Sequence, residues 1–206
     1  MAMAPKARFI VLDGIDGCGK STQARRLAEH LTGASGVQAL HLREPGSTRA
    51  GERIRELLLA REHDLDPGVE LLLFAAARRQ MLRELVAPAL AAGRDVVCER
   101  FHASTFAYQA IAGGLPEDDV LALLGRWSND PEPDALVLLD VDPREAAVRR
   151  GAPTDRIEAK GLEFQLRVAE GYRRFAVLRP ATRVVDGRGS VDEVARAVRR
   201  AVGLDD

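Results

Sequence analysis

Short apolar runs alternate with longer helical patterns along most of the 206-residue chain. Five runs rich in β-branched and apolar residues predict strands, because they are too short for helices and are bounded by turn residues. These runs lie at residues 9–12, 37–42, 95–98, 135–139 and 183–186. Elsewhere, apolar residues recur at helical spacing. We expect helices at residues 22–31, 50–59, 67–85, 104–112, 116–127, 144–150, 163–177 and 191–202, with the glycines of 33–36 closing the first.

The alternation of strands and helices predicts an α/β fold. A parallel sheet of about five strands would carry helices on both faces. The length and the 46% hydrophobic content favour one domain spanning residues 1–206. In such a sheet, the loops that follow the strand carboxyl ends meet at one edge, where ligands bind. We therefore expect one site, built from these loops.

The first predicted strand leads into a glycine-rich loop. Residues 14–21 match G-x-x-x-x-G-K-[ST], the phosphate-binding P-loop. The glycines let successive backbone N–H groups converge on phosphate oxygens, and the next helix directs its positive end at the same anion. Lys20 would reach the outer phosphates, and the Ser21 hydroxyl would ligate Mg²⁺. The residues expected to bind a nucleoside triphosphate here are Gly14, Ile15, Asp16, Gly17, Cys18, Gly19, Lys20, Ser21 and Thr22.

The overall charge excludes some partner classes. Lys and Arg number 30 and Asp and Glu 31, so we expect neither nucleic acid nor an anionic membrane as partner. No apolar run approaches a membrane span. The two cysteines, Cys18 and Cys98, do not resemble a secretory disulfide framework, which favours a reducing cytoplasm. Strong anion binding must therefore be local. Arginines near the strand ends are the candidates, and Arg43, Arg78 and Arg100 qualify by position.

Four further segments occur in one order and spacing with the P-loop. They are residues 43–46 (Arg-Glu-Pro-Gly), 73–80 (Leu-Phe-Ala-Ala-Ala-Arg-Arg-Gln), 99–109 with Glu-Arg-Phe at its start, and 155–158 (Asp-Arg-Ile-Glu). Over roughly residues 8–200, the chain resembles bacterial thymidylate kinases of the type with catalytic arginines in a lid. The resemblance implies a P-loop kinase fold. It also implies transfer of a phosphoryl group from ATP to the 5′-phosphate of dTMP, giving dTDP and ADP, with Mg²⁺.

The resemblance also assigns an acceptor site. It implies that Phe74 stacks on thymine, that Arg78 contacts the base and its surroundings, and that Arg100 grips the 5′-phosphate. Tyr108 holds the position that crowds a 2′-hydroxyl. An aromatic face suits a base, and a guanidinium fork suits phosphate oxygens. The residues expected to bind dTMP are Asp16, Arg43, Pro45, Phe74, Arg78, Arg100, Ser104, Thr105, Tyr108 and Gln109.

By the same resemblance, residues 149–160 form a mobile lid over ATP. Some family members carry an arginine inside the P-loop, but here that position is Gly17, so the catalytic arginine should come from the lid. The expected catalytic set is Asp16, Lys20, Arg100, Arg150 and Arg156. The resemblance also implies that Arg149, Gly187 and Arg188 bind ATP, in addition to the P-loop residues. The metal would contact Ser21, Asp16 and Glu99, partly through water or phosphate; Glu99 stands where the family often has aspartate.

Alternative interpretations stay open for single residues and for the function. Phe74 and Tyr108 could be packing residues only, Glu99 and Arg100 a structural ion pair, and Asp16 a helix cap. Arg149 or Arg150 could merely complement a helix dipole. The chain could phosphorylate another nucleoside monophosphate or a nucleoside, or be a nucleotide-binding switch without turnover. The Asn-Lys-x-Asp element of GTPase switches is absent from the sequence, which disfavours such a switch. The family also tends to form homodimers through helices near the acceptor side.

Overall fold

A parallel five-stranded sheet organises the protein. The computed structural model describes residues 6–153 and 155–204. The strands are β1 (Phe9–Asp13), β2 (Leu40–Arg43), β3 (Val96–Glu99), β4 (Ala135–Asp140) and β5 (Arg183–Asp186). They lie in the order β2-β3-β1-β4-β5, and every pair is parallel. The predicted fold class is confirmed.

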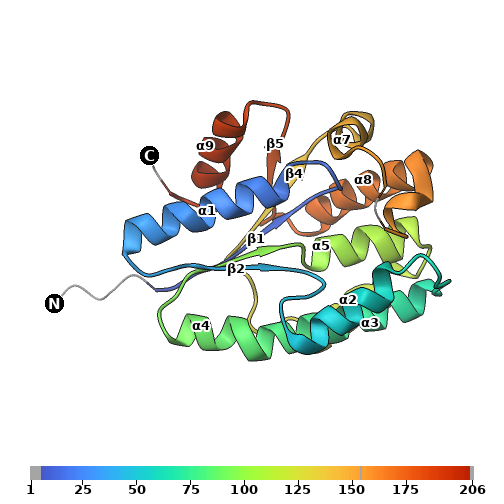
Figure 1. Cartoon of the computed structure of the whole chain (residues 1–206), viewed down its shortest axis with the longest axis horizontal. Coiled ribbons are helices and arrows are strands. Elements are labelled where there is room, and N and C mark those ends of the chain that lie inside the picture. Colours follow the sequence, from blue (N-terminus) through green and yellow to red (C-terminus); the bar gives the residue numbers. More distant parts are fainter. Residues whose placement is uncertain (1–5, 154, 205–206) are drawn as a thin grey trace.

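Helices cover both faces of this sheet. In Figure 1, α1 and α9 lie above the strands, and α3 and α4 lie below them. The α-helices are α1 (Lys20–Ser35), α2 (Arg49–Leu59), α3 (Pro67–Met81), α4 (Ala87–Ala91), α5 (His102–Thr105), α6 (Glu117–Trp127), α7 (Pro143–Arg150), α8 (Gly161–Leu178) and α9 (Val191–Ala201). Two π-helical segments, η1 (Leu82–Val86) and η2 (Phe106–Ala112), and a 3₁₀ turn, η3 (Glu158–Lys160), complete them.

The central strand β1 is buried throughout because helices pack on both of its faces. Its side chains alternate. Ile10 and Leu12 join the apolar cluster that includes Leu27 of α1. Phe9 and Val11 join a second cluster with η1 and β3. The continuous apolar run in the sequence therefore corresponds to a strand whose side chains pack into two hydrophobic clusters, one on each face of the sheet.

Three element boundaries differ from the prediction. Helix α1 continues through Gly33 to Ser35 and ends at Gly36, whose φ of 70° suits glycine. The strand predicted from residue 37 begins only at Leu40, because Ala39 donates its backbone N–H to Thr32 Oγ1 (3.0 Å) at the end of the turn. The helix predicted over 67–85 continues through η1 into α4. In α1 the glycine at position 33 does not end the helix, because tertiary context overrides its low propensity.

A buried carboxylate joins the sheet to the helices beneath its carboxyl edge. Asp13, at the end of β1, is fully buried. It accepts hydrogen bonds from the backbone N–H groups of Gly14 (2.9 Å), Phe101 (3.0 Å) and Ser104 (3.0 Å). It also accepts from the Ser104 hydroxyl (2.6 Å) and the Tyr172 hydroxyl (2.8 Å). Full hydrogen bonding lets this charge remain buried, so the P-loop and α5 are held in register.

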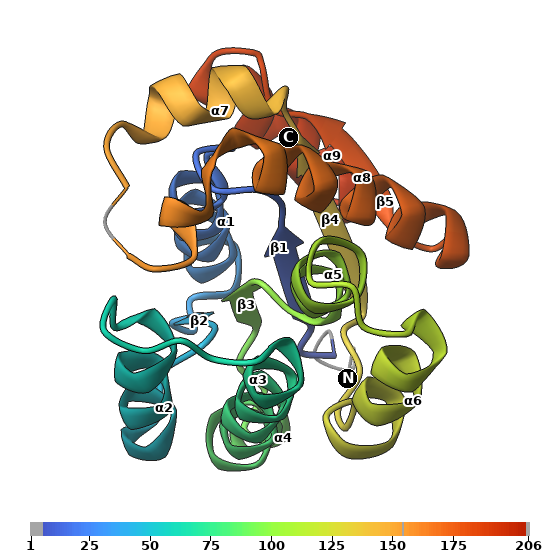
Figure 2. The same cartoon turned by 90° about the vertical axis from the view of Figure 1, so that its right-hand side faces the viewer.

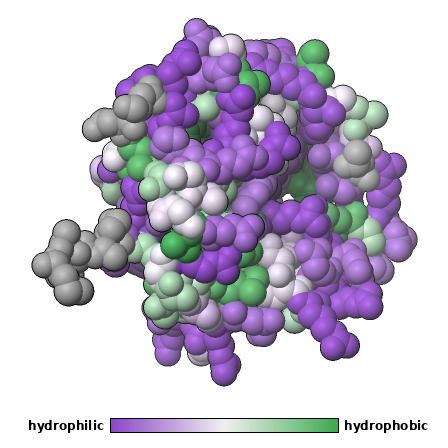
Figure 3. Space-filling model, turned by 60° about the vertical axis from the view of Figure 1, so that its left-hand side comes forward, coloured by the Kyte–Doolittle hydropathy of each residue, from purple (hydrophilic) through white to green (hydrophobic). Residues whose placement is uncertain are grey.

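Figure 3 shows one face on which hydrophilic residues predominate and hydrophobic residues occur in small separate patches. Within residues 6–153 and 155–204, no helix has both the length and the apolar character needed to span a bilayer.

Candidate active site

A cavity of about 250 Å³ opens at the carboxyl edge of the sheet. In the view of Figure 2, α7 and the segment that follows it lie above this edge, and α2 and α3 lie below. The cavity brings together every residue that the sequence assigns to the acceptor side and to the metal, together with Lys20. Those in its wall are Asp16, Lys20, Ser21, Arg43, Pro45, Phe74, Arg78, Glu99, Arg100, Ser104, Thr105, Tyr108 and Gln109.

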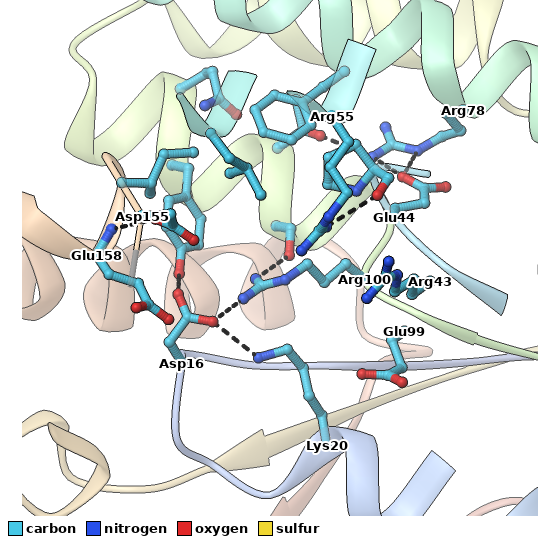
Figure 4. A pocket seen from close by; sticks show the side chains of 18 of the residues that line it. Asp16, Lys20, Arg43, Glu44, Arg55, Arg78, Glu99, Arg100, Asp155 and Glu158 are labelled. Carbon is cyan, nitrogen blue, oxygen red and sulfur yellow. Dashed lines mark hydrogen bonds and ion pairs between the residues drawn. The ribbon is translucent and has the colours of Figure 1, made fainter. Parts of the chain in front are cut away.

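Asp16 is the electrostatic centre of the cavity (Figure 4). Its Oδ1 pairs with Lys20 Nζ (3.3 Å) and with Arg100 Nη2, and its Oδ2 accepts from the Tyr108 hydroxyl (2.9 Å). Burial disfavours the charged carboxyl, but the positive charges of Arg100 and Lys20 outweigh it and hold the pKa of Asp16 below its usual range. Asp16 therefore stays ionised and orients both cations, rather than acting as a helix cap.

Arg100 follows β3 in an unusual backbone conformation. Its φ is 70°, in the left-handed region that non-glycine residues seldom adopt. Its Nη1 donates to Ser104 Oγ (3.1 Å) and to the Tyr172 hydroxyl (3.4 Å), and its guanidinium carbon lies 5.5 Å from the centre of the Tyr108 ring. Such strain costs about 1–3 kcal/mol and tends to be kept at functional sites. The turn directs the guanidinium back over the P-loop.

Arg55 is a cavity residue that the sequence reasoning missed. It lies in α2, lines the cavity with Arg43 and Arg100, and donates from Nη1 to the Pro45 carbonyl (3.0 Å). Burial and the neighbouring charge of Arg43 lower its pKa. One signal could have found it, because Arg55 follows Gly51 by four residues and precedes Leu58 by three. Gly51 and Leu58 are the buried positions of α2, so this helical stripe faces inward.

A buried ion pair forms the floor of the acceptor side. Arg78, only 1% exposed, contacts Glu44 Oε2 through Nε (2.7 Å) and Nη2 (2.6 Å), and Nη2 also donates to Thr105 Oγ1 (2.9 Å). Burial raises the pKa of Glu44 to about 7, against the opposing charge of Arg78. Within the described chain, Arg78 Nη1 and Glu44 Oε1 have no hydrogen-bond partner. Both atoms are buried, so the ion pair holds the Arg78 side chain in place at the cavity wall. Phe74 packs against the core at the cavity wall.

Ser21 and Glu99 form the oxygen-rich corner beside Lys20. The Ser21 hydroxyl donates to Glu99 Oε2, and Glu99 Oε1 lies 2.9 Å from His41 Nε2. Burial opposes ionisation of Glu99, but the contacts with His41 and Ser21 prevail and lower its pKa. Among the described residues, no group of three or more His, Cys, Asp or Glu side chains could hold a metal by itself. A hydroxyl and a carboxylate nevertheless fit Mg²⁺, which usually takes few protein ligands and completes its shell with phosphates and water.

Gly17 explains why the loop carries no arginine. Its φ is 89°, and a Cβ added there would lie 2.0 Å from the carbonyl oxygen of Ala146 in α7. No L-side chain can occupy this position without moving α7. Cys18, the next residue, is buried, and burial raises the pKa of its thiol. Its protonated thiol fills space beneath the loop, which favours the packing interpretation over a reactive thiol.

The remaining P-loop residues and the loop after β5 lie together. Gly14, Ile15, Gly19 and Thr22 surround Lys20 and Ser21 in the loop and the first turn of α1. A Cβ on Gly187 would lie 3.4 Å from the Cys18 carbonyl oxygen, so Gly187 packs on the loop. Arg149 Nη1 donates to the Gly187 carbonyl (2.8 Å). Arg188 instead pairs with Asp186 (2.7 Å) at the exposed end of β5.

The two arginines predicted to be catalytic in the 149–160 segment are not in the cavity wall. Arg156 is held on the acceptor side, with Nη2 2.7 Å from Glu70 Oε1 and 3.0 Å from the Leu58 carbonyl oxygen. Arg150 ends α7 half-buried, and its Nε has no partner within the described residues. Thr154 of this segment lies outside the described residues. Asp155, Ile157 and Glu158 do line the cavity.

Comparisons with known proteins give one consistent result. The sequence pattern of the family described as thymidylate kinase matches residues 12–198. A thymidylate kinase of Caldanaerobacter subterraneus subsp. tengcongensis is 41% identical over 199 residues, covering 96% of this chain and 95% of that protein. One of Gluconobacter oxydans is 43% identical over 206 residues, covering 97% and 96%. The crystal structure of thymidylate kinase from Ehrlichia chaffeensis superimposes with a TM-score of 0.80 at 31% identity, covering 97% of this chain and 100% of that one.

Proposed function

The chain belongs to the thymidylate kinase family, and from this premise we propose that it transfers the γ-phosphoryl group of ATP to the 5′-phosphate of dTMP. The resemblance seen in the motifs is thereby confirmed, and the chain is an ATP-dependent nucleoside monophosphate kinase. One observation carries the assignment of the site. A P-loop and a group of three arginines, Arg43, Arg55 and Arg100, meet in one cavity. Two anions can therefore be held against each other there, as phosphoryl transfer requires.

The donor half is the P-loop with its neighbours. Backbone N–H groups of the loop and the start of α1 bind the ATP phosphates, and Lys20 neutralises the outer ones. Arg149, Gly187 and Arg188 border the nucleoside of ATP, in keeping with the contact of Arg149 with Gly187 beside the loop. Ser21 and Glu99 would hold Mg²⁺. When bound, the ion supplies charge neutralisation on the phosphate oxygens. A role of Asp16 as metal ligand stays a prediction, since both of its oxygens contact protein groups.

The acceptor half lies over α2, α3 and α5. Arg100 and Arg55 grip the 5′-phosphate with Arg43 at the edge, because planar guanidinium groups match phosphate oxygens. Phe74 stacks on the base, and Arg78, which lines the cavity with Glu44, contacts the base and its surroundings. Pro45 follows a cis peptide bond and helps to close this side. Ser104, Thr105, Tyr108 and Gln109 surround the sugar and base.

The chemistry requires alignment and charge cancellation rather than a general base. The attacking phosphate oxygen is already anionic, so Lys20 and Arg100 need only bring two anions into line and offset their repulsion. Asp16 fixes both cations. Residues 149–160 form a lid that excludes water and delivers an arginine to the transferring group. Gly17 leaves no room for that arginine in the loop itself.

ADP formation with a panel of nucleosides and nucleoside monophosphates tests the function. We expect turnover with ATP, Mg²⁺ and dTMP, and at least about 100-fold lower kcat/KM for thymidine, because the arginine group then lacks its anion. Activity on thymidine but not on dTMP would overturn the acceptor. Nucleotide binding without any turnover would instead identify a switch.

The assembly is a homodimer in this proposal. Val69 and Leu72 of α3 are 43% and 60% exposed, on the side of the helix away from the cavity. They border an apolar groove with Leu115, Pro116 and Val120. Exposed apolar surface of this kind marks protein interfaces. The two free thiols, Cys18 and Cys98, support a reducing compartment, and the proposal places the enzyme in the cytoplasm.

A further inference from the structure

Glu70 is a buried carboxylate that none of the roles above uses. It lies in α3 one turn before Phe74 and two turns before Arg78, so the three side chains share one face of the helix. Phe74 and Arg78 line the cavity, but Glu70 does not. It is 2% exposed. A fully buried carboxylate is costly unless it is paired, so its partners indicate why it is there.

The two oxygens of Glu70 face different parts of the enzyme. Oε1 contacts the 149–160 segment, at 2.7 Å from Arg156 Nη2 and 3.3 Å from Lys160 Nζ. Oε2 accepts a hydrogen bond from Gln109 Nε2 (2.9 Å), and Gln109 is part of the cavity wall. The side chain thus bridges the lid and the acceptor pocket.

The contacts of Arg156 extend this bridge to α2. Its Nε and Nη2 donate to the Leu58 carbonyl at 3.2 and 3.0 Å, and its backbone N–H donates to the Leu59 carbonyl at 3.3 Å. The next residue, Ile157, is buried in the main core, and its neighbours Asp155 and Glu158 line the cavity. The carboxyl-terminal end of the lid is therefore anchored through Arg156, which directly follows Asp155 and lies two residues before Glu158.

We propose that Glu70 is a positioning residue for phosphoryl transfer, which docks the carboxyl-terminal end of the lid through Arg156 and orients Gln109 in the acceptor pocket. The inference rests on the proposed function. It assigns different roles to the two lid arginines. Arg156 anchors the carboxyl-terminal end of the lid, whereas Arg150, at the end of α7 and the other end of the lid, reaches the transferring group. Lys160 adds a second positive charge to the anchor.

Two substitutions of Glu70 separate its contact with the lid from its contact with Gln109. In Glu70→Gln, the amide oxygen still accepts from Gln109, but the charge that holds Arg156 and Lys160 is lost. We expect kcat to fall by about 10- to 100-fold, the scale at which a displacement of about 1 Å affects catalysis, with KM for dTMP close to that of the wild type. In Glu70→Ala both contacts are lost, and KM for dTMP should also rise. Glu56→Gln is the matched control, because it removes an exposed glutamate–arginine pair of α2 and should leave both constants unchanged.

A double variant distinguishes positioning from stability. Glu70→Gln with Arg156→Gln removes both buried charges together, so its thermal stability should recover relative to Glu70→Gln alone. Its kcat should stay as low as that of the single variant, because the lid end remains undocked. Recovery of kcat together with stability would overturn the inference, since Glu70 would then be merely structural.

Limited trypsin digestion measures whether the carboxyl-terminal end of the lid is docked, independently of kinase activity. Glu70→Gln keeps the cleavage sites after Arg156 and Lys160, and mass spectrometry should show cleavage there at least about 10-fold faster than in the wild type, because local opening exposes them. Equal cleavage rates in both proteins would overturn the inference even in an active kinase. Failure of the wild type to phosphorylate dTMP would refute the proposed function instead, and the digestion would still decide whether Glu70 docks the lid.

Discussion

At the scale of single residues, the cavity is built from charges that hold one another in place. Asp16 holds Lys20 and Arg100 close together by pairing with both, and Glu44 pairs with Arg78. Since each pair lies out of bulk water, its electrostatic interaction is stronger than it would be at the surface. Cations arranged in advance can then neutralise incoming phosphates without first having to reorganise.

Arg55→Ala should raise KM for dTMP by about 10- to 100-fold, the equivalent of one lost charge-assisted hydrogen bond. The effect on kcat should be smaller, because Arg100 still aligns the phosphate. Steady-state kinetics with varied dTMP measures both constants. Arg53→Ala is the control, since Arg53 lies in the same helix but is exposed and pairs with Glu56. An unchanged KM in Arg55→Ala would remove Arg55 from the acceptor site.

Glu44→Gln should change how stability depends on pH. The folded-state pKa of Glu44, about 7, lies above its ordinary value of 4.5, so the folded protein binds this proton more tightly than the unfolded chain. The resulting stabilisation is complete below the ordinary value and is lost as pH rises through 7. The unfolding free energy of the wild type minus that of Glu44→Gln should therefore fall by about 2 kcal/mol between pH 5 and pH 8. Denaturant titrations at several pH values measure this difference, and a constant difference would contradict the prediction.

At the scale of elements, the site depends on how closely α8 packs against η2, the segment that carries Tyr108 and Gln109. The rings of Phe106 in η2 and Phe175 in α8 lie 5.6 Å apart, and Tyr172 of α8 contacts the Tyr108 ring edge-on at 6.4 Å. Gly171 permits this approach, because a Cβ there would lie 2.6 Å from the Cα of Ala107. The acceptor wall is therefore positioned from behind by α8.

Gly171→Ala should destabilise the protein by about 1–3 kcal/mol, because overpacking outweighs the better helix propensity of alanine. KM for dTMP should rise as η2 is displaced. Thermal unfolding and kinetics test both effects. Gly125→Ala is the control: it lies in α6 with no atom within 4 Å of an added Cβ, so it should be neutral or stabilising by up to about 1 kcal/mol. Equal stability of the two variants would show that η2 tolerates the added methyl group.

Elements and motifs differ in how far the sequence predicts them. Short apolar runs bounded by turn residues correctly predicted the five strands of the sheet, because a buried strand leaves a local pattern in the sequence. Strand β5 even lies at the predicted residues 183–186. Gly33 and Val37 were misread because contacts between elements decide those boundaries. In the site, the P-loop and strand-end residues were found from motifs. Arg55 and Glu70 were not. The helical spacing of Gly51, Arg55 and Leu58 could have placed Arg55 on the inward face of α2, but it does not show what Arg55 faces. Glu70 has no such signal, because its partners Gln109, Arg156 and Lys160 lie far away in the sequence.

At the scale of the whole molecule, two copies of the chain should associate through α3 and α6. Phe74 and Arg78 occupy the cavity side of α3, so its outer residues Val69 and Leu72 remain for a partner. An interface there would press on the helix that carries the base-binding residues. Assembly and the acceptor pocket would then share one element.

Leu72→Glu should weaken dimerisation by at least about 10-fold, because it places a charge in an apolar interface. Size-exclusion chromatography with light scattering, at several protein concentrations, measures the change. Val177→Glu is the control, because Val177 on α8 is also exposed (79%, against 60% for Leu72) but lies outside the groove. A wild-type protein that is monomeric at all concentrations would contradict the predicted assembly.

The contact of Gly17 with the Ala146 carbonyl restricts how this enzyme could change over evolution. An arginine at position 17 would push α7 away, and α7 ends in Arg149 and Arg150. A gain of positive charge in the loop would therefore disturb the arginines from which the proposed mechanism draws its lid charge. The two arrangements are alternatives that single substitutions do not connect. A lineage could move from one to the other only by remodelling α7 and the loop together, so the location of the catalytic arginine should be inherited over long periods as a stable trait.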